Sequence, residues 1–107
     1  MKSALIVIDM QKDFCYPDGS LFGGEHIKNI FEPVNRAVQE AREKMPVIFT
    51  QDWHRKDDVE FKIWPPHCIA DTRGAEIIDE ISMIDGVSST ETAVVLRKIK
   101  EDFRIKV

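Results

Sequence analysis

Three short apolar segments constrain the fold of this chain more than any other feature. The first, Ala4–Ile8, is continuously apolar and lacks the polar alternation of a half-exposed strand. Such a run is typical of a strand buried on both faces of a parallel sheet. The other two segments, Val47–Thr50 and Thr92–Leu96, are rich in β-branched residues, which favour strand over helix. We therefore expect three parallel strands.

Helical and loop segments separate these strands. Apolar residues recur at three- and four-residue steps over Ile30–Met45, which predicts an amphipathic helix with Pro33 tolerated in its first turn. A shorter helix is expected within Gly74–Ile84. The turn residues of Asp13–Gly24 predict a long loop rather than a regular element. This order of elements predicts a doubly wound α/β sheet built from βαβ crossovers.

Composition indicates one domain over residues 1–107 and excludes several classes of protein. The chain is 43% hydrophobic and 32% charged, which is ordinary globular composition. Its net charge is −4 and its basic residues are dispersed, so nucleic-acid binding has little support and a small-molecule substrate fits better. The apolar N-terminal run is too short to span a membrane. We expect a cytoplasmic protein in which Cys15 and Cys68 are reduced thiols.

Polar residues that can bind a metal follow the second apolar segment. Asp52 and His54 are two residues apart, so in an extended chain their side chains share one face. A loop can bring His67 back to them, and the Trp64–Pro66 segment before it restricts the backbone path. Two imidazoles and a carboxylate suit a divalent metal. The alternative is three unrelated polar residues in a loop.

Charged residues follow each expected strand. Asp9 comes after the first strand, Asp52 follows the second closely, and Lys98 comes after the third. Functional groups in such sheets gather at the carboxyl ends of the strands, so these side chains are expected to converge. For Asp9 and Lys98, a simple ion pair that closes the end of the sheet remains an alternative.

Four segments of the chain carry recognisable motifs: Ile8–Phe14, Thr50–His54, Trp64–Cys68 with the trailing Gly74–Glu76, and Val94–Lys98. In this order they resemble the nicotinamidase and pyrazinamidase branch of the isochorismatase-like cysteine hydrolases. The resemblance implies a three-layer, Rossmann-like, mostly parallel sheet, of which this chain would form the N-terminal portion, truncated after the third strand. It also implies a catalytic aspartate, lysine and cysteine beside a divalent metal.

The resemblance assigns roles to individual residues. Asp9 matches the general base and Lys98 matches the lysine that favours the thiolate and stabilises the oxyanion. Phe14 and Trp64 match aromatic residues that sandwich the substrate ring, although core packing is the alternative for both. The metal ligands implied by the resemblance are Asp52, His54 and His67.

A further ligand and the identity of the metal stay open. Glu60 stands where some family members have another histidine ligand, and it is equally compatible with a surface charge. The metal is expected to be zinc, with iron or manganese as alternatives. Without a metal, as in an isochorismatase or carbamoyl-amidase relative, the aspartate and two histidines would have no purpose.

The nucleophile of the family has no match in this chain. That cysteine follows a later strand, and Cys15 and Cys68 are not expected to replace it. The resemblance stops at Ile99. One hypothesis is an amidohydrolase that converts nicotinamide or pyrazinamide to the acid and ammonia, with the thiol supplied from elsewhere. The other is an inactive fragment or a metal- and ligand-binding module. Unpaired strand edges and uncovered apolar faces predict a homo-oligomer or a second chain that completes the sheet.

Overall fold

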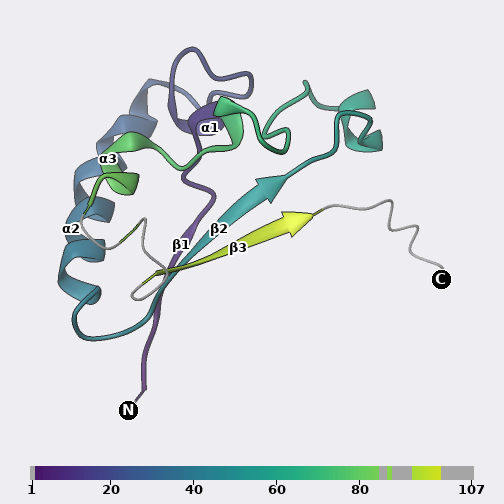
Figure 1. Ribbon diagram of the computed structural model, residues 1–107. Coiled ribbons are helices and arrows are strands. Elements are labelled where there is room, and N and C mark those ends of the chain that lie inside the picture. Colours follow the sequence, from purple (N-terminus) through teal and green to yellow (C-terminus); the bar gives the residue numbers. More distant parts are fainter. Residues whose placement is uncertain (1, 85–86, 88–92, 100–107) are drawn as a thin grey trace.

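Three parallel strands form the centre of the molecule. The computed structural model describes residues 2–84, 87 and 93–99. The strands are β1 (Leu5–Ile8), β2 (Val47–Trp53) and β3 (Ala93–Ile99). They pair in the order β1-β2-β3, and both pairs are parallel (Figure 1). The parallel α/β sheet expected from the three apolar segments is confirmed.

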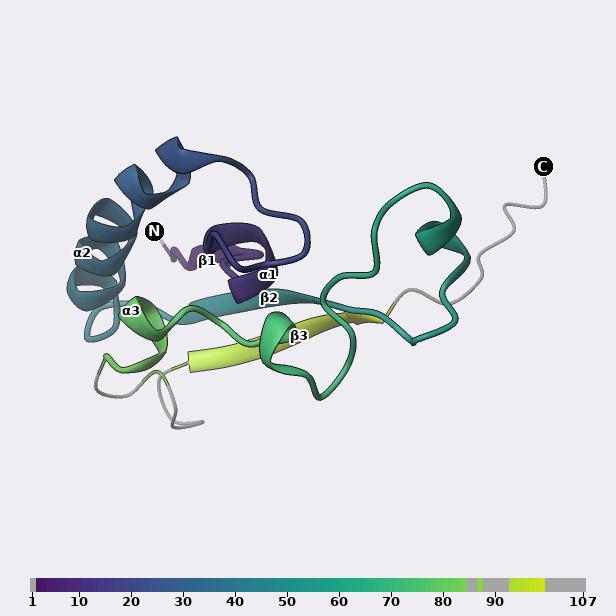
Figure 2. The same ribbon diagram turned by 90° about the horizontal axis from the view of Figure 1, so that it is seen from above.

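The helices of the described part are short except for one. They are α1 (Lys12–Cys15), α2 (Phe31–Ala41) and α3 (Asp79–Ser82). Three 3₁₀ segments accompany them, at Glu25–Ile30, Val59–Lys62 and Arg73–Ala75. Figure 2 shows α2 and α3 near the starting ends of the strands, whereas the loop that follows β2 extends beyond their carboxyl ends. No helix among the described residues is long and apolar enough to cross a membrane.

Helix α2 is shorter than the apolar periodicity predicted. Its buried side carries Val38 and Ala41, and Pro33 lies in the first turn, as expected. The helix ends at Ala41, however, and not at Met45. A residue that precedes a proline is disfavoured in the α conformation, and Met45 directly precedes Pro46. The chain therefore leaves the helix in a turn before β2 begins.

One expected element differs from the structure. The segment predicted as a loop begins with the single helical turn α1, and only the residues after Cys15 are irregular. Lys12, the first residue of this turn, holds it against a later part of the chain, because its Nζ lies 2.6 Å from Glu76 Oε1 and 3.1 Å from Asp79 Oδ1. This difference arises from contacts between segments far apart in the sequence. The short helix expected within Gly74–Ile84 is confirmed as α3.

Burial of strands β1 and β2 is one-sided in the described part, so the prediction of a strand buried on both faces is wrong for β1. Val7 and Phe49 lie on the helix-covered face and are at most 5% exposed. On the opposite face, Ile6 is 55% and Ile8 63% exposed. The paired residues of β3 on that face, which include Leu96, are also exposed. An apolar face of the sheet is therefore open.

Strands β2 and β3 are longer than their apolar runs. Asp52 was expected just after the second strand and Lys98 after the third, but both lie inside strands, where the register pairs their backbones. The parallel hydrogen-bond ladder continues through the polar residues. Buried Gln51 is tolerated because its Nε2 donates to the Ala75 carbonyl at 2.9 Å. The polar end of β2 thus begins the functional site.

Candidate metal centre

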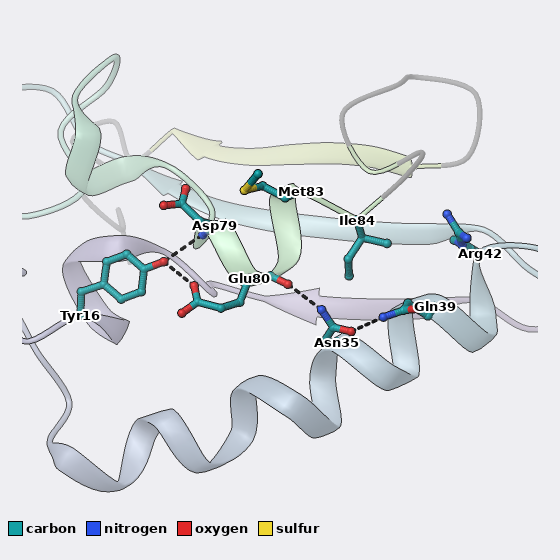
Figure 3. Close-up of a pocket in the computed structure, with 8 residues that line it drawn as sticks. All are labelled: Tyr16, Asn35, Gln39, Arg42, Asp79, Glu80, Met83 and Ile84. Carbon is teal, nitrogen blue, oxygen red and sulfur yellow. Dashed lines mark hydrogen bonds between the residues drawn. The ribbon is translucent and has the colours of Figure 1, made fainter.

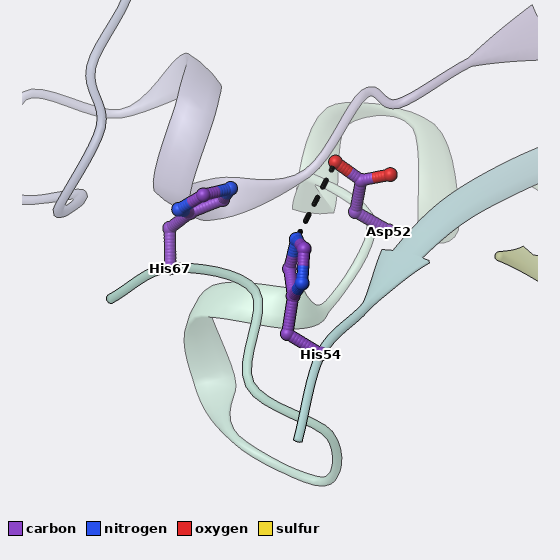
Figure 4. Close-up of side chains that lie close together, drawn as sticks. All are labelled: Asp52, His54 and His67. Carbon is purple, nitrogen blue, oxygen red and sulfur yellow. Dashed lines mark ion pairs between the residues drawn. The ribbon is translucent and has the colours of Figure 1, made fainter. Parts of the chain in front are cut away.

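The three residues predicted as metal ligands lie together at the carboxyl end of β2. One ligand atom from each of Asp52, His54 and His67 falls within 4.8 Å of the others, and all three side chains are buried (Figure 4). His54 Nε2 lies 3.9 Å from Asp52 Oδ2, and the two imidazole centroids are 4.7 Å apart. The chain thus brings together, in one cluster, the donors that the sequence pattern pointed to.

A backbone pairing closes the loop that returns His67 to the cluster. His54 forms an isolated parallel bridge with Ile69. The His54 N–H donates to the Cys68 carbonyl at 2.9 Å, and the Ala70 N–H donates to the His54 carbonyl at 2.8 Å. These two hydrogen bonds pair His54, which directly follows β2, with Cys68–Ala70 in a parallel arrangement. His67, immediately before this bridge, is thereby held against His54.

The hydrogen bonds of both imidazoles determine which ring nitrogen faces the cluster. His67 Nδ1 lies 2.7 Å from the Pro65 carbonyl oxygen, which can only accept, so Nδ1 carries the proton and Nε2 keeps its lone pair. His54 Nδ1 lies 2.8 Å from Asp58 Oδ2. The other nitrogen of that ring, His54 Nε2, is buried and has no hydrogen-bond partner among the described residues.

This donor set fits a divalent metal. Tetrahedral ligands at about 2.1 Å from a zinc ion lie about 3.4 Å from one another, so the atoms of the cluster need to approach by at most about 1.4 Å. Three protein ligands with a fourth position open to substrate or water are typical of catalytic zinc. A bound cation would also satisfy the orphaned lone pair of His54 Nε2, which is otherwise an unfavourable buried group.

Gln11 holds the Asp52 backbone, a role that sequence reasoning missed. Its side chain is fully buried. The side-chain oxygen accepts from the Asp52 N–H at 2.9 Å, and Nε2 donates to the carbonyls of Asp52 and Ala75, both at 2.9 Å. The position of Gln11 inside the Ile8–Phe14 motif was the available signal. The two bonds between the Gln11 side chain and the Asp52 backbone hold the end of β2 against the start of α1.

Aromatic rings enclose the histidines. Phe61 packs on both imidazoles, with centroid distances of 5.2 Å to His54 and 5.5 Å to His67. Phe14, expected to contact the substrate ring, lies 5.6 Å from His67. Trp64, the other expected ring contact, is 51% exposed. The structure therefore brings Phe14 to the cluster, leaves Trp64 at the surface, and adds Phe61, which sequence reasoning missed.

Asp9 lies at the end of β1 in a constrained conformation. Its φ of 54° is in the left-handed region that few residues other than glycine adopt. Thr50 stabilises this conformation, because the Thr50 hydroxyl donates to Asp9 Oδ1 at 2.7 Å and accepts from the Asp9 N–H at 3.1 Å. The backbone of Lys98 pairs with Asp52 on the other side of β2; only the backbone of this lysine is described. Strained residues of this kind cluster at functional sites.

Neither cysteine is a ready nucleophile. Cys15 and Cys68 are both free and buried. Burial, with a contribution from the charge of Glu80, raises the pKa of Cys15 to about 11. Burial raises the pKa of Cys68 far above its usual range, and the carboxylates of Asp13, Asp52 and Asp9 raise it further. Both side chains are therefore thiols at neutral pH, whereas catalysis requires the thiolate.

Glu60 lies beside the cluster rather than within it. Ligand atoms of His54, Asp58 and Glu60 form a second group within 4.8 Å of one another. The backbone N–H of Glu60 donates to Asp58 Oδ1 at 2.9 Å, an arrangement in which Asp58 caps the 3₁₀ turn that follows. His54 is therefore the one residue that this second group shares with the cluster of Asp52, His54 and His67.

A separate groove contains none of the predicted site residues. It has a volume of about 600 Å³ and lies between α2 and α3 (Figure 3). The Tyr16 hydroxyl accepts from the Asp79 N–H at 2.9 Å, and Asn35 Nδ2 donates to the Glu80 carbonyl at 2.6 Å. These bonds attach α3 to α1 and α2. The groove is on the helical side of the molecule, whereas the metal cluster is at the end of β2.

Comparisons with known proteins agree with the parallel α/β fold. A family model described as Isochorismatase domain matches residues 3–97. A nicotinamidase of Saccharomyces cerevisiae is 30% identical over 108 aligned residues, which cover 72% of this chain and 49% of that protein. The crystal structure of a pyrazinamidase of Pyrococcus horikoshii in complex with zinc has a TM-score of 0.74 and 35% identity, covering 92% of this chain and 52% of that one.

A nicotinamidase/pyrazinamidase of Bacillus subtilis is similar over much the same range. Its crystal structure has a TM-score of 0.83 and 30% identity, and covers 94% of this chain and 57% of that one. The chain thus spans about half the length of the relatives that it matches. The part of this chain that matches them contains strands β1 to β3 and the cluster of Asp52, His54 and His67.

Proposed function

The chain belongs to the isochorismatase domain family, and from this premise we propose that it supplies the metal site, general base and ring pocket of an amidohydrolase. The substrate would be nicotinamide or pyrazinamide, converted to the corresponding acid and ammonia. The observation that carries the proposal is the buried cluster of Asp52, His54 and His67, in which His54 Nε2 has a lone pair and no hydrogen-bond partner in the described part of the chain. Relatives named nicotinamidase and pyrazinamidase support the substrate class.

Each residue would act through its position around the cluster. Asp9 would accept the proton of an attacking thiol as its sulfur bonds to the amide carbon, and would return that proton to the departing ammonia. Asp9 would then activate the water that releases the acid from the thioester. Lys98 would stabilise the negative charge on the amide oxygen. Phe14 and Trp64 would contact the faces of the substrate ring.

The metal centre would orient the substrate. Asp52, His54 and His67 would hold zinc, or alternatively iron or manganese, with Glu60 as a further ligand direct or through water. When bound, the metal would offer a Lewis-acidic position to the pyridine nitrogen or to water. Phe14 and Phe61, which pack against His67, would restrict access of water to that position.

The thiol would come from outside the matched segments. We propose that residues 1–107 form the N-terminal portion of one isochorismatase-like domain, and that another polypeptide segment covers the open sheet face. A later part of the same protein, a second copy or a second chain would provide that cover. Because Asp9 follows exposed Ile8 at the edge of this face, a segment bound there would also lie beside the proposed base.

A second candidate function is ligand and metal binding without turnover. The raised pKa values of Cys15 and Cys68 favour it, because neither described thiol is ionised at neutral pH. Under this alternative the chain would bind a cation and a flat aromatic ligand but would release no ammonia.

Metal analysis tests the first part of the proposal. The purified chain is expected to contain a stoichiometric divalent metal, measured by elemental analysis after dialysis. The double variant His54→Ala, His67→Ala is expected to lose it. The matched control is His26→Ala, since His26 is exposed and lies outside the cluster. A metal content that the double variant does not reduce contradicts the ligand assignment.

Ammonia release separates the two functions. The chain by itself is expected to release no detectable ammonia from nicotinamide, and release is expected only when a thiol-bearing segment completes the site. Robust turnover by the chain alone that Cys68→Ser abolishes would show that Cys68 is the nucleophile. In that case the assignment of the thiol to another segment is wrong, while the metal result stands independently.

A further inference from the structure

His54 has a carboxylate on the side of its ring that faces away from the metal cluster. We propose that Asp58 is a positioning residue of the metal site, which fixes the tautomer and orientation of His54 so that Nε2 is presented to the cation. The inference rests on the proposed metal-binding function and adds a residue to which neither the family motifs nor the expected ligand set assigns a role.

The geometry of the pair supports this role. Asp58 Oδ2 lies 2.8 Å from His54 Nδ1, and the side chains are 7% and 0% exposed. A carboxylate accepts hydrogen bonds and does not donate them, so the shared proton belongs to Nδ1 of the imidazole. In a neutral imidazole the other nitrogen, Nε2, then has the lone pair. That nitrogen lies on the Asp52 side of the ring.

The free nitrogen is the second observation. His54 Nε2 is buried without a hydrogen-bond partner in the described part, while Nδ1 of the same ring is bonded. A histidine that binds a metal through one nitrogen commonly donates from the other to a carboxylate, which sets the ring orientation and raises the basicity of the ligand. The arrangement of Asp52, His54 and Asp58 has this pattern before any ion binds.

Asp58 is better suited to this position than to direct coordination. Both of its oxygens are already engaged: Oδ2 with His54 Nδ1, and Oδ1 with the Glu60 N–H at 2.9 Å. The second of these bonds starts the 3₁₀ turn at Val59–Lys62, which includes Phe61. Because Phe61 packs on both imidazoles, Asp58 links the turn to the ring that it orients.

The substitution Asp58→Asn distinguishes positioning from simple packing. It keeps the size of the side chain, but one of the two acceptor oxygens becomes an NH₂ donor. If the amide oxygen accepts from His54, the NH₂ group faces the Glu60 N–H. If the NH₂ group faces His54, Nδ1 becomes an acceptor and the proton moves to Nε2, where it blocks coordination.

The experiment combines metal affinity with a direct reading of the tautomer. Zinc affinity is measured by competition with a chromophoric chelator for the wild-type chain, Asp58→Asn and Asp57→Asn. Asp57 is the matched control, because it is the adjacent residue, its side chain is 73% exposed and it pairs with Arg55. In metal-free protein, long-range ¹H–¹⁵N NMR spectra of the imidazoles show which nitrogen of His54 carries the proton.

The expected results are a 10- to 100-fold loss of zinc affinity in Asp58→Asn, no change in Asp57→Asn, and a proton on Nδ1 of His54 in the wild type. Circular dichroism of each variant controls for folding. Equal zinc affinity of the wild type and Asp58→Asn overturns the inference, as does a proton on Nε2 in the wild type. Absence of zinc binding by the wild type instead contradicts the proposed metal site. In that case the position of the proton on His54 still tests by itself whether Asp58 fixes the tautomer of that ring.

Discussion

One carboxylate oxygen of Asp13 lies 2.8 Å from the backbone nitrogen of Cys68, 55 residues later in the chain. The other oxygen accepts from the Ser20 N–H at 3.1 Å. Asp13 thus joins α1, the loop that follows it, and the segment that carries His67. The position of His67 therefore depends on a residue outside the set of expected ligands.

Replacement of Asp13 should destabilise the chain. Asp13→Ala leaves the partly buried Cys68 N–H without its acceptor, and we expect the free energy of unfolding to fall by about 1–3 kcal/mol, measured by urea titration. Asp18→Ala is the control, because Asp18 forms an exposed pair with Arg73 and its loss should change stability by less than about 0.5 kcal/mol. Equal effects of the two substitutions would contradict the anchoring role.

Gly74 is required by the same contact. A Cβ at Gly74 would lie 2.0 Å from Asp13 Oδ2, so Gly74→Ala must displace this carboxylate. We expect a loss of about 1–3 kcal/mol in unfolding free energy. The effect of Asp13→Ala should be smaller in the Gly74→Ala background, because the bond to Cys68 is already disturbed. Strict additivity in this double-mutant cycle would show that the two positions act independently.

The two thiols should be unreactive in the folded chain. With a pKa of about 11, Cys15 is a thiolate in only about one molecule in a thousand at pH 8. Burial and three carboxylates make the thiolate of Cys68 still less accessible. Iodoacetamide labelling at pH 8, followed by mass spectrometry, should be slow until urea is added. Rapid labelling of either cysteine in the folded state would contradict the described burial.

The same shifts set the sign of the alkaline stability change. An acid whose pKa is raised on folding binds its proton more tightly in the folded state, so its contribution is present below the unfolded pKa and is lost as pH rises above it. For Cys15 the window runs from 9.0 to about 11. Replacement by alanine should therefore reduce the fall in melting temperature between pH 9 and pH 11, measured by circular dichroism against the wild type.

The open sheet face should drive self-association. Ile6 and Leu96, on this face, are 55% and 52% exposed. We expect the wild-type chain to form oligomers in light scattering coupled to gel filtration, and Ile6→Lys with Leu96→Lys to weaken association at least about tenfold. Met83→Lys is the control, because Met83 is 82% exposed on the helical side of the molecule. A wild-type chain that stays monomeric at high concentration would remove this argument for an oligomer.

Local sequence patterns predicted which segments are helices or strands better than they predicted the residues at which these elements begin and end. The apolar runs correctly predicted β1, β2 and β3, and periodicity correctly predicted α2. The predicted end of α2 failed near Pro46, and the limits of α1 and β2 failed because distant contacts decide them. Lys12 holds α1 through Glu76 and Asp79, and the ladder with β3 extends β2 through Asp52. Neither contact leaves a trace in the spacing of residues along the chain.

Residue type and spacing by themselves determined that Asp52, His54 and His67 are able to meet, because a period of two puts the first pair on one face and a loop returns the third. Only the tertiary structure decided how they meet. The bonds of Gln11 to Asp52 and of Asp58 to His54 Nδ1 set the orientation of the donors. A hydrogen bond depends on distance and angle between specific atoms, whereas a sequence pattern specifies only which groups are available and which face they share.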